Sequence, residues 1–324
     1  MKTGLVIQGP IFSPGFGPYK WTANGEFKKE YIPFDSSENI LQLVKIASPI
    51  FDEIVVVTWS SEYSGNVKRK LMSTNIAFLE CNEELFLSEM SHLGHHVKNG
   101  NHKYHQIYTI NLGTKELLKR DCQVMAKIRT DHFLDINALH KAVKKQASQD
   151  FSYFGAPYLN LFELDRLTDF YFVSHCHTME KLTQAYLSDS QINEDTHYDY
   201  FYKFTKYLVS HDNRNDNSFI RNQLSKRFFT YFVWTSYLYP IDLKVFKSLS
   251  WRGLKVNHRL NYWIRLFYTI KCAKGKLLIP AVVFNFFIIN VLRVFHRLNG
   301  RSISFIQYRL SKFLNVRRGL DAKD

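Results

Sequence analysis

Short apolar runs alternate with longer mixed segments over the first 250 residues, a pattern typical of an α/β domain. The runs predict strands over residues 5–7, 54–57, 76–79 and 124–128. Apolar positions at helical spacing predict helices around residues 40–47, 107–118 and 179–187. This order of elements predicts a mostly parallel sheet flanked by helices, with ligands bound beyond the carboxyl ends of its strands.

Three polar turns follow predicted strands and should meet at one edge of the sheet. They are Gln8-Gly9-Pro10, Thr58-Trp59-Ser60 and Arg129-Thr130-Asp131. A glycine turn lets the backbone approach a ligand, and a glutamine amide both donates and accepts hydrogen bonds. A carboxylate such as Asp131 suits Mg²⁺ or Mn²⁺, which also bind water and substrate phosphate. This interpretation requires one shared pocket with Asp131 accessible; the alternative is ordinary turns without a ligand.

The composition excludes several classes of protein. The chain is 45% hydrophobic, so it can bury a core, and its four cysteines are scattered without a C-x-x-C pair. Neither a disulfide framework nor a zinc knuckle is indicated, and a reducing compartment is expected. The apolar run near Met1 is too short for a signal peptide, which favours a cytoplasmic location. Phosphate-loop, dinucleotide and serine-hydrolase motifs are absent from the sequence.

The net charge of +14 is concentrated at the C-terminal end. Residues 251–324 contain 15 of the 43 Lys and Arg residues and only two acidic residues, whereas residues 1–250 are nearly neutral. The stretch 277–292 is apolar and uncharged but contains Pro280 and two asparagines, so it is better suited to the surface of a bilayer than to crossing it. Aromatic residues among the cations, beginning with Trp251, are typical of the headgroup layer.

We therefore predict two domains, residues 1–250 and a basic, aromatic, membrane-associating helical extension over residues 251–324. A buried C-terminal helix with a solvated basic surface is the structural alternative. A basic module that binds nucleic acid is a functional alternative, but nucleic-acid contact does not need an apolar stretch, so no nucleic acid is expected.

The ordered motifs resemble the WavE-type lipopolysaccharide synthesis family of glycosyltransferases, related to the GT-A fold. The motifs, scattered over residues 4–200, are Val6-Ile7-Gln8-Gly9-Pro10-Ile11, Val57-Thr58-Trp59, Asn101…Gln106-Ile107…Gly113 and Lys127-Ile128-Arg129-Thr130-Asp131. The resemblance implies a GT-A-like fold, a nucleotide-sugar donor and a lipid-linked glycan acceptor from lipopolysaccharide or another surface polysaccharide. With the basic extension, it predicts a peripheral enzyme on the inner face of the cytoplasmic membrane.

The resemblance also implies roles for particular residues. Gln8, Gly9 and Pro10 would contact the nucleobase and ribose, and Asp131 would bind the divalent cation, Mn²⁺ or Mg²⁺. Arg129 replaces the first acid of the acid-x-acid metal motif, so it could itself pair with the diphosphate. The remaining residues predicted to bind the donor are Thr58, Asn101, Gln106 and Thr130.

A general base would be needed if the transfer inverts the anomeric centre. The adjacent acids Glu194 and Asp195 follow a predicted helix and are the first candidates, and Asp169 is another. A retaining transfer needs no such base. Transfer of a sugar phosphate, or a non-catalytic role in binding membrane or nucleic acid, are the alternative functions.

Overall fold

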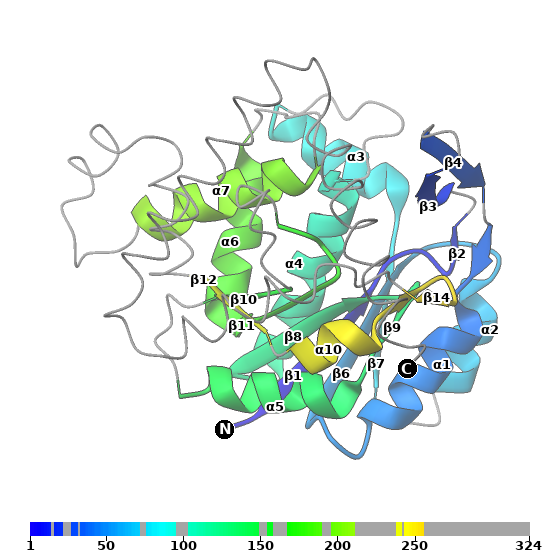
Figure 1. Cartoon of the computed structure of the whole chain (residues 1–324). Coiled ribbons are helices and arrows are strands. Elements are labelled where there is room, and N and C mark those ends of the chain that lie inside the picture. Colours follow the sequence, from blue (N-terminus) through cyan, green and yellow to red (C-terminus); the bar gives the residue numbers. More distant parts are fainter. Residues whose placement is uncertain are drawn as a thin grey trace, which may run out of the picture. The chain divides into compact units, whose positions relative to one another are not determined.

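The structure of the 324-residue chain is a computed structural model (Figure 1). It describes residues 1–13, 16–21, 27–31, 33–71, 76–94, 103–148, 154–157, 167–189, 196–210, 238–241 and 243–255. The chain divides into two compact units, and the described residues all belong to the first, which comprises Met1–Tyr158 and Asp165–Val256.

A seven-stranded sheet forms the centre of this unit, in the order β12-β10-β11-β8-β1-β6-β7. β11 is antiparallel to both of its neighbours, and the other neighbouring pairs are parallel. β1, β6, β7 and β8 therefore end at the same edge. The strands are β1 (Thr3–Gln8), β6 (Glu53–Trp59), β7 (Ala77–Cys81), β8 (Val124–Arg129), β10 (Phe154–Ala156), β11 (Tyr171–His175) and β12 (Leu238–Pro240).

Three small sheets accompany the large one. β13 pairs with both β9 and β14, β2 pairs with β5, and β3 pairs with β4, all antiparallel. Their bounds are β2 (Phe12–Ser13), β3 (Phe16–Trp21), β4 (Phe27–Tyr31), β5 (Phe34–Asp35), β9 (His132–Phe133), β13 (Ser250–Trp251) and β14 (Leu254–Lys255).

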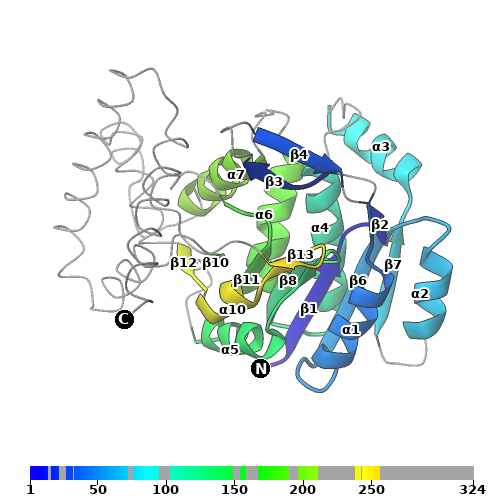
Figure 2. The ribbon, with the colours of Figure 1, turned by 45° about the vertical axis from the view of Figure 1, so that its right-hand side comes forward.

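Helices cover both faces of the large sheet, as Figures 1 and 2 show. α1, α5 and α10 lie on one face, and α4, α6 and α7 lie on the other. The bounds are α1 (Ser37–Ala47), α2 (Ser64–Leu71), α3 (Glu83–His92), α4 (Lys103–Lys119), α5 (Ile136–Gln146), α6 (Cys176–Ser188), α7 (Thr196–Ser210) and α10 (Leu243–Ser248).

The alternation of side chains along β1 explains this layering. Leu5 and Ile7 are fully buried in the apolar core that includes residues of α1, α5 and α10. Val6 points to the opposite face, where a Cβ on Gly113 of α4 would lie 2.7 Å from its Cγ1. A larger residue at this point of α4 would push the helix away from the sheet. Gln8, two residues beyond Val6, is thereby directed toward α4 as well.

The α/β class predicted from the sequence is confirmed, and the expected strands and helices are present with longer bounds. Residues 196–210, where no helix or strand is predicted from the sequence, form α7. Among the described helices, none combines the length and the apolar content that a bilayer crossing requires. Residues 256–324, including the uncharged stretch, lie outside the described residues, so their membrane contact stays a prediction.

Candidate functional site at the carboxyl ends of the strands

Backbone hydrogen bonds tie the carboxyl ends of β1, β6 and β8 together. The N–H of Thr130 donates to the carbonyl oxygen of Gln8 at 3.0 Å. The N–H of Gly9 donates to the carbonyl oxygen of Val57 at 3.1 Å. Gly9 has a φ of +136°, and a Cβ there would lie 2.7 Å from Oγ1 of Thr130, which donates to the carbonyl oxygen of Pro10. Glycine is therefore required for the three strand ends to meet, whereas the predicted approach of this turn to a ligand stays a prediction.

The Gln8 side chain carries a buried amide group with one unsatisfied end. Gln8 is 1% exposed, and its Oε1 accepts a hydrogen bond from Oγ1 of Thr109 in α4 at 2.9 Å. Its Nε2 has no hydrogen-bond partner among the described residues. Buried side-chain amides are nearly always paired, so such an atom at a strand end indicates a place for a ligand or a water molecule.

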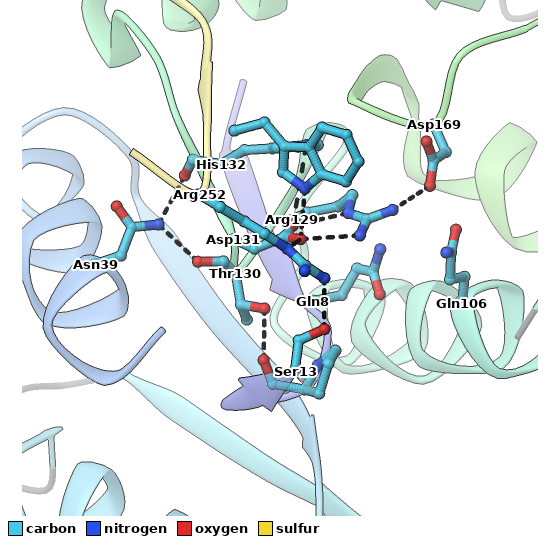
Figure 3. A network of polar contacts seen from close by, with 12 residues as sticks. Gln8, Ser13, Asn39, Gln106, Arg129, Thr130, Asp131, His132, Asp169 and Arg252 are labelled. Carbon is cyan, nitrogen blue, oxygen red and sulfur yellow. Dashed lines mark hydrogen bonds and ion pairs between the residues drawn. The ribbon is translucent and has the colours of Figure 1, made fainter. Parts of the chain in front are cut away.

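Gln106 and Tyr200 bring α4 and α7 to the same place. The Tyr200 hydroxyl donates to Oε1 of Gln106 at 2.8 Å. Burial, and after it the carboxylate of Asp169, raises the pKa of Tyr200 well above its ordinary value, so the hydroxyl stays a neutral donor. Figure 3 shows the Gln106 amide near that of Gln8 and the Arg129 guanidinium. Gln106 therefore lies near Gln8 and Arg129, its predicted role in donor binding stays a prediction, and Tyr200 was not anticipated.

An ion-pair network lies at the end of β8. Nε of Arg129 donates to Oδ1 of Asp131 at 2.9 Å, and Nη2 donates to Oδ2 at 3.1 Å. Nη1 of Arg129 donates to Oδ2 of Asp169 at 2.5 Å. Burial alone lowers the pKa of Arg129, but the two carboxylates more than offset this and raise it. Burial opposes ionisation of Asp131 as well, yet Arg129 and His132 hold its pKa well below the usual range.

A segment from far along the chain covers Asp131. Trp251 of β13 pairs with His132 of β9, and Nε1 of Trp251 donates to Oδ2 of Asp131 at 2.9 Å. The backbone N–H of Arg252 donates to the carbonyl oxygen of Asp131, and its Nε lies 3.4 Å from Oδ2. The Arg252 side chain continues to Oγ of Ser13 at 2.5 Å (Figure 3).

The expectation of an accessible Asp131 is therefore wrong: the residue is 5% exposed. Trp251 and Arg252, which the sequence placed in the basic extension, supply the cover. Arg252 has a φ of +51° and Gly253 one of +77°, which form the tight turn between β13 and β14. The sequence of residues 250–255 is too short to show a strand period, so the pairing of β13 with β9 and β14 could not be predicted from it.

The donor set around Asp131 does not fit a divalent cation. Both carboxylate oxygens already accept hydrogen bonds from N–H donors, and two of the donor side chains are guanidinium groups. Among the residues that the structure describes, no group of three or more His, Cys, Asp or Glu side chains is arranged to hold a metal ion. Burial lowers the pKa of the neighbouring His132 to about 4, so its ring is neutral at physiological pH.

The other predicted residues lie in different surroundings. Thr58 is fully buried at the end of β6 and follows Val57, which is the register partner of Gln8 of β1. Since side chains alternate along a strand, Thr58 points to the face of the sheet opposite to that of Gln8. Thr130 follows β8, and its hydroxyl donates to the carbonyl oxygen of Pro10, a contact that stabilises the turn after β1. Asn101, Glu194 and Asp195 lie outside the described residues, so their predicted roles stay predictions.

No family model matches the sequence, and no curated protein matches it. The resemblance to the WavE-type family therefore stays a prediction. Similar solved structures include mannose-1-phosphate geranyltransferase from Thermus thermophilus, with 10% identity and a TM-score of 0.31. That match covers 61% of this chain and 66% of the other, slightly less than two thirds of its length.

Two further solved structures are similar at the same low level. Mouse xyloside xylosyltransferase 1 in its apo form has 8% identity and a TM-score of 0.29, over 47% of this chain and 67% of that chain. A transferase mutant with two cysteine-to-serine replacements has 10% identity and a TM-score of 0.30, over 68% of this chain and 90% of that chain.

Proposed function

We propose that the chain is a GT-A-like glycosyltransferase that moves a sugar from a nucleotide-sugar donor to a lipid-linked glycan acceptor. The observation that carries the proposal is the buried, unsatisfied amide end of Gln8 beside Arg129. These two residues are register partners on adjacent parallel strands, at the edge where open α/β sheets bind ligands. An amide and a guanidinium suit a ligand rich in hydroxyl and phosphate oxygens, such as a sugar nucleotide.

Asp169 supports an acid–base role within this proposal. Its side chain is 7% exposed, and one of its oxygens accepts a hydrogen bond from Nη1 of Arg129. Of the three candidate bases, Asp169 is the one whose surroundings the structure describes. An inverting transfer would use such a carboxylate to take the proton of the acceptor hydroxyl. Glu194 and Asp195 remain the competing candidates, and replacing each of the three by its amide would identify the base.

Donor binding is the direct test of the function. A thermal-shift screen against nucleoside diphosphates and their sugars should give at least one ligand that raises the melting temperature, because a ligand of the folded state stabilises it. Gln8→Met should weaken this ligand at least about tenfold, since the unsatisfied amide is removed. The matched control is Gln123→Met, because Oε1 of Gln123 accepts from Lys2 at the opposite edge of the sheet.

The products separate sugar transfer from its nearest rival. Transfer of the sugar alone releases a nucleoside diphosphate, whereas transfer of a sugar phosphate releases a nucleoside monophosphate. Absence of stabilisation by every sugar nucleotide would overturn the proposal.

Membrane association is the second part of the proposal. It is supported by the +13 charge and the uncharged stretch within residues 251–324, which together suit an anionic lipid surface. Attachment there, on the inner face of the cytoplasmic membrane, would raise the local concentration of a lipid-linked acceptor. Flotation with vesicles containing anionic lipid should retain the protein, and a gel-shift assay should detect no binding to nucleic acid. The opposite pair of results would favour a nucleic-acid-binding protein.

A further inference from the structure

Both carboxylate oxygens of Asp131 accept hydrogen bonds from N–H donors, and the donors include two guanidinium groups. Oδ1 accepts from Nε of Arg129, and Oδ2 accepts from Nη2 of Arg129, Nε1 of Trp251 and Nε of Arg252. A divalent cation bound to this carboxylate would compete with these donors for the same two oxygens. It would also have to approach two guanidinium groups within hydrogen-bond distance of the same oxygen, which Coulomb repulsion opposes in a buried site.

Arg252 offsets the charge of Asp131. Its side chain is 5% exposed, the same as that of Asp131, and the two lie 3.4 Å apart. Cζ of Arg252 also lies 5.5 Å from the centre of the Trp251 ring, which favours a cation at this position. Without Arg252, the site would lose one positive charge beside the carboxylates of Asp131 and Asp169, and its attraction for an anionic ligand would weaken.

Arg129 is placed to contact such a ligand. A guanidinium has five N–H groups, and three of those of Arg129 are used by Asp131 and Asp169. The other two have no partner among the described residues, and the side chain is 19% exposed. The unsatisfied amide of Gln8 lies on the neighbouring strand at the same level. These N–H groups form a donor-rich place for phosphate oxygens.

We infer that Arg129 binds a diphosphate group without a divalent cation, because Arg252 offsets the negative charge of Asp131. Asp131 is then a positioning residue that holds the two guanidinium groups. The inference rests on the proposed function for the identity of the ligand, the diphosphate of the donor. It differs from the metal site implied by the sequence, because the positive charge comes from the protein itself.

The test uses isothermal titration of the full chain with inorganic pyrophosphate and with a set of nucleoside diphosphates, in EDTA and in Mn²⁺. Pyrophosphate should bind in EDTA, and Mn²⁺ should not tighten its binding. Binding that needs Mn²⁺, or that Mn²⁺ tightens tenfold or more, would overturn the inference while leaving the proposed function in place. Pyrophosphate binding in EDTA with no response to any nucleoside diphosphate would support the inference and overturn the proposed function.

Variants separate the roles of the two charged partners. Arg252→Gln should weaken pyrophosphate in EDTA at least about tenfold, and Arg252→Lys should restore most of the affinity because it keeps the charge. Arg120→Gln is the matched control, since Arg120 pairs with Glu53 and Glu116 elsewhere and should leave binding unchanged. Equal affinity of Arg252→Gln and the wild-type chain, both folded by circular dichroism, would overturn the inference.

Asp131→Asn gives an independent readout. A positioning role predicts that this variant changes the pyrophosphate affinity by the same factor in EDTA and in Mn²⁺. A metal-ligand role predicts an effect in Mn²⁺ alone, and that result would overturn the inference.

Discussion

Nε1 of Trp251 donates a hydrogen bond to Oδ2 of Asp131 at 2.9 Å, across 120 positions of the chain. The contact depends on β13, whose residues Ser250 and Trp251 pair with Phe133 and His132 of β9. Residues 250–255 are therefore part of the site at the carboxyl ends of the strands, although the sequence assigns most of them to the basic extension. The residues that follow them carry the charge for which membrane contact is proposed.

Removing this indole donor should destabilise the folded chain. Trp251→Phe keeps the apolar ring but leaves Oδ2 of Asp131 with one donor fewer, so the free energy of unfolding should fall by about 1–2 kcal/mol. Urea unfolding followed by circular dichroism measures this change. An unchanged midpoint with an unchanged slope would show that the hydrogen bond does not form in solution.

Arg129 should be far more sensitive to conservative replacement than an arginine on the surface. Lysine cannot reproduce the two parallel hydrogen bonds to Asp131 and the third to Asp169, so Arg129→Lys should lower the free energy of unfolding by about 2–4 kcal/mol. Arg120→Lys is the comparison, because Arg120 is 35% exposed in its ion pairs with Glu53 and Glu116. Arg120→Lys should lower the free energy of unfolding by about 0.5 kcal/mol or less. Similar losses at both positions would contradict the account of a buried network.

The sequence predicts the central sheet and part of the site because both depend on short apolar runs and on the residues that directly follow them. Four apolar runs mark β1, β6, β7 and β8, and their parallel order brings Gln8, Thr130 and Asp131 to one edge. The positive φ of Gly9 and its close contact with Thr130 were not predicted, since the sequence linked the Gly-Pro turn to the approach of a ligand. Alternation along β1 and β6 then directs the side chains of Gln8 and Thr58 to opposite faces of the sheet.

The cover over Asp131 could not be predicted from local patterns. β9 and β13 are two residues long each, and so short a run has no measurable period. Their pairing joins segments more than 100 positions apart, and Trp251 among cations has the same local appearance as a residue of a membrane surface. Tyr200 was missed for a related reason, since the aromatic residues of α7 pack on several sides and show no clear spacing.

Lys127 should make stability depend on pH. It is completely buried in β8, its Nζ donates to the carbonyl oxygen of Asp169 and lies 5.0 Å from the centre of the Phe172 ring, and burial lowers its pKa to about 7. Between pH 7 and the ordinary lysine pKa near 10, the unfolded chain holds a proton that the folded chain has released. Stability should therefore rise with pH in this window and be lost as the pH falls toward 7.

The comparison is made against Lys127→Met, in which this titration is absent. Between pH 7 and 9 the wild-type chain should gain roughly 2 kcal/mol of unfolding free energy relative to the variant. Lys119→Met is the control, because the Lys119 side chain is 75% exposed and should give no such difference. Parallel pH profiles for the wild-type chain and Lys127→Met would show that Lys127 keeps an ordinary pKa.

Replacing two helical glycines by alanine should change the free energy of unfolding in opposite directions. Alanine favours a helix over glycine by about 1 kcal/mol, and Gly65 of α2 has nothing within 4 Å of the added Cβ, so Gly65→Ala should raise the free energy of unfolding by up to that amount. At Gly113 the Cβ would lie 2.7 Å from Cγ1 of Val6 and 3.0 Å from Cγ2 of Val57, both buried strand residues that have little room to move. The overpacking should exceed the gain in helix propensity, for a net loss of about 1–2 kcal/mol.

The same replacement also tests the site, because α4 carries Thr109 and Gln106. Displacement of the helix would lengthen the contact between Thr109 and Gln8, so Gly113→Ala should weaken the donor ligand while Gly65→Ala leaves its affinity unchanged. Urea unfolding and ligand titration measure the two effects separately. Stabilisation by Gly113→Ala would show that α4 does not pack against β1 at the distance described, and the position of Gln106 in the site would have to be abandoned with it.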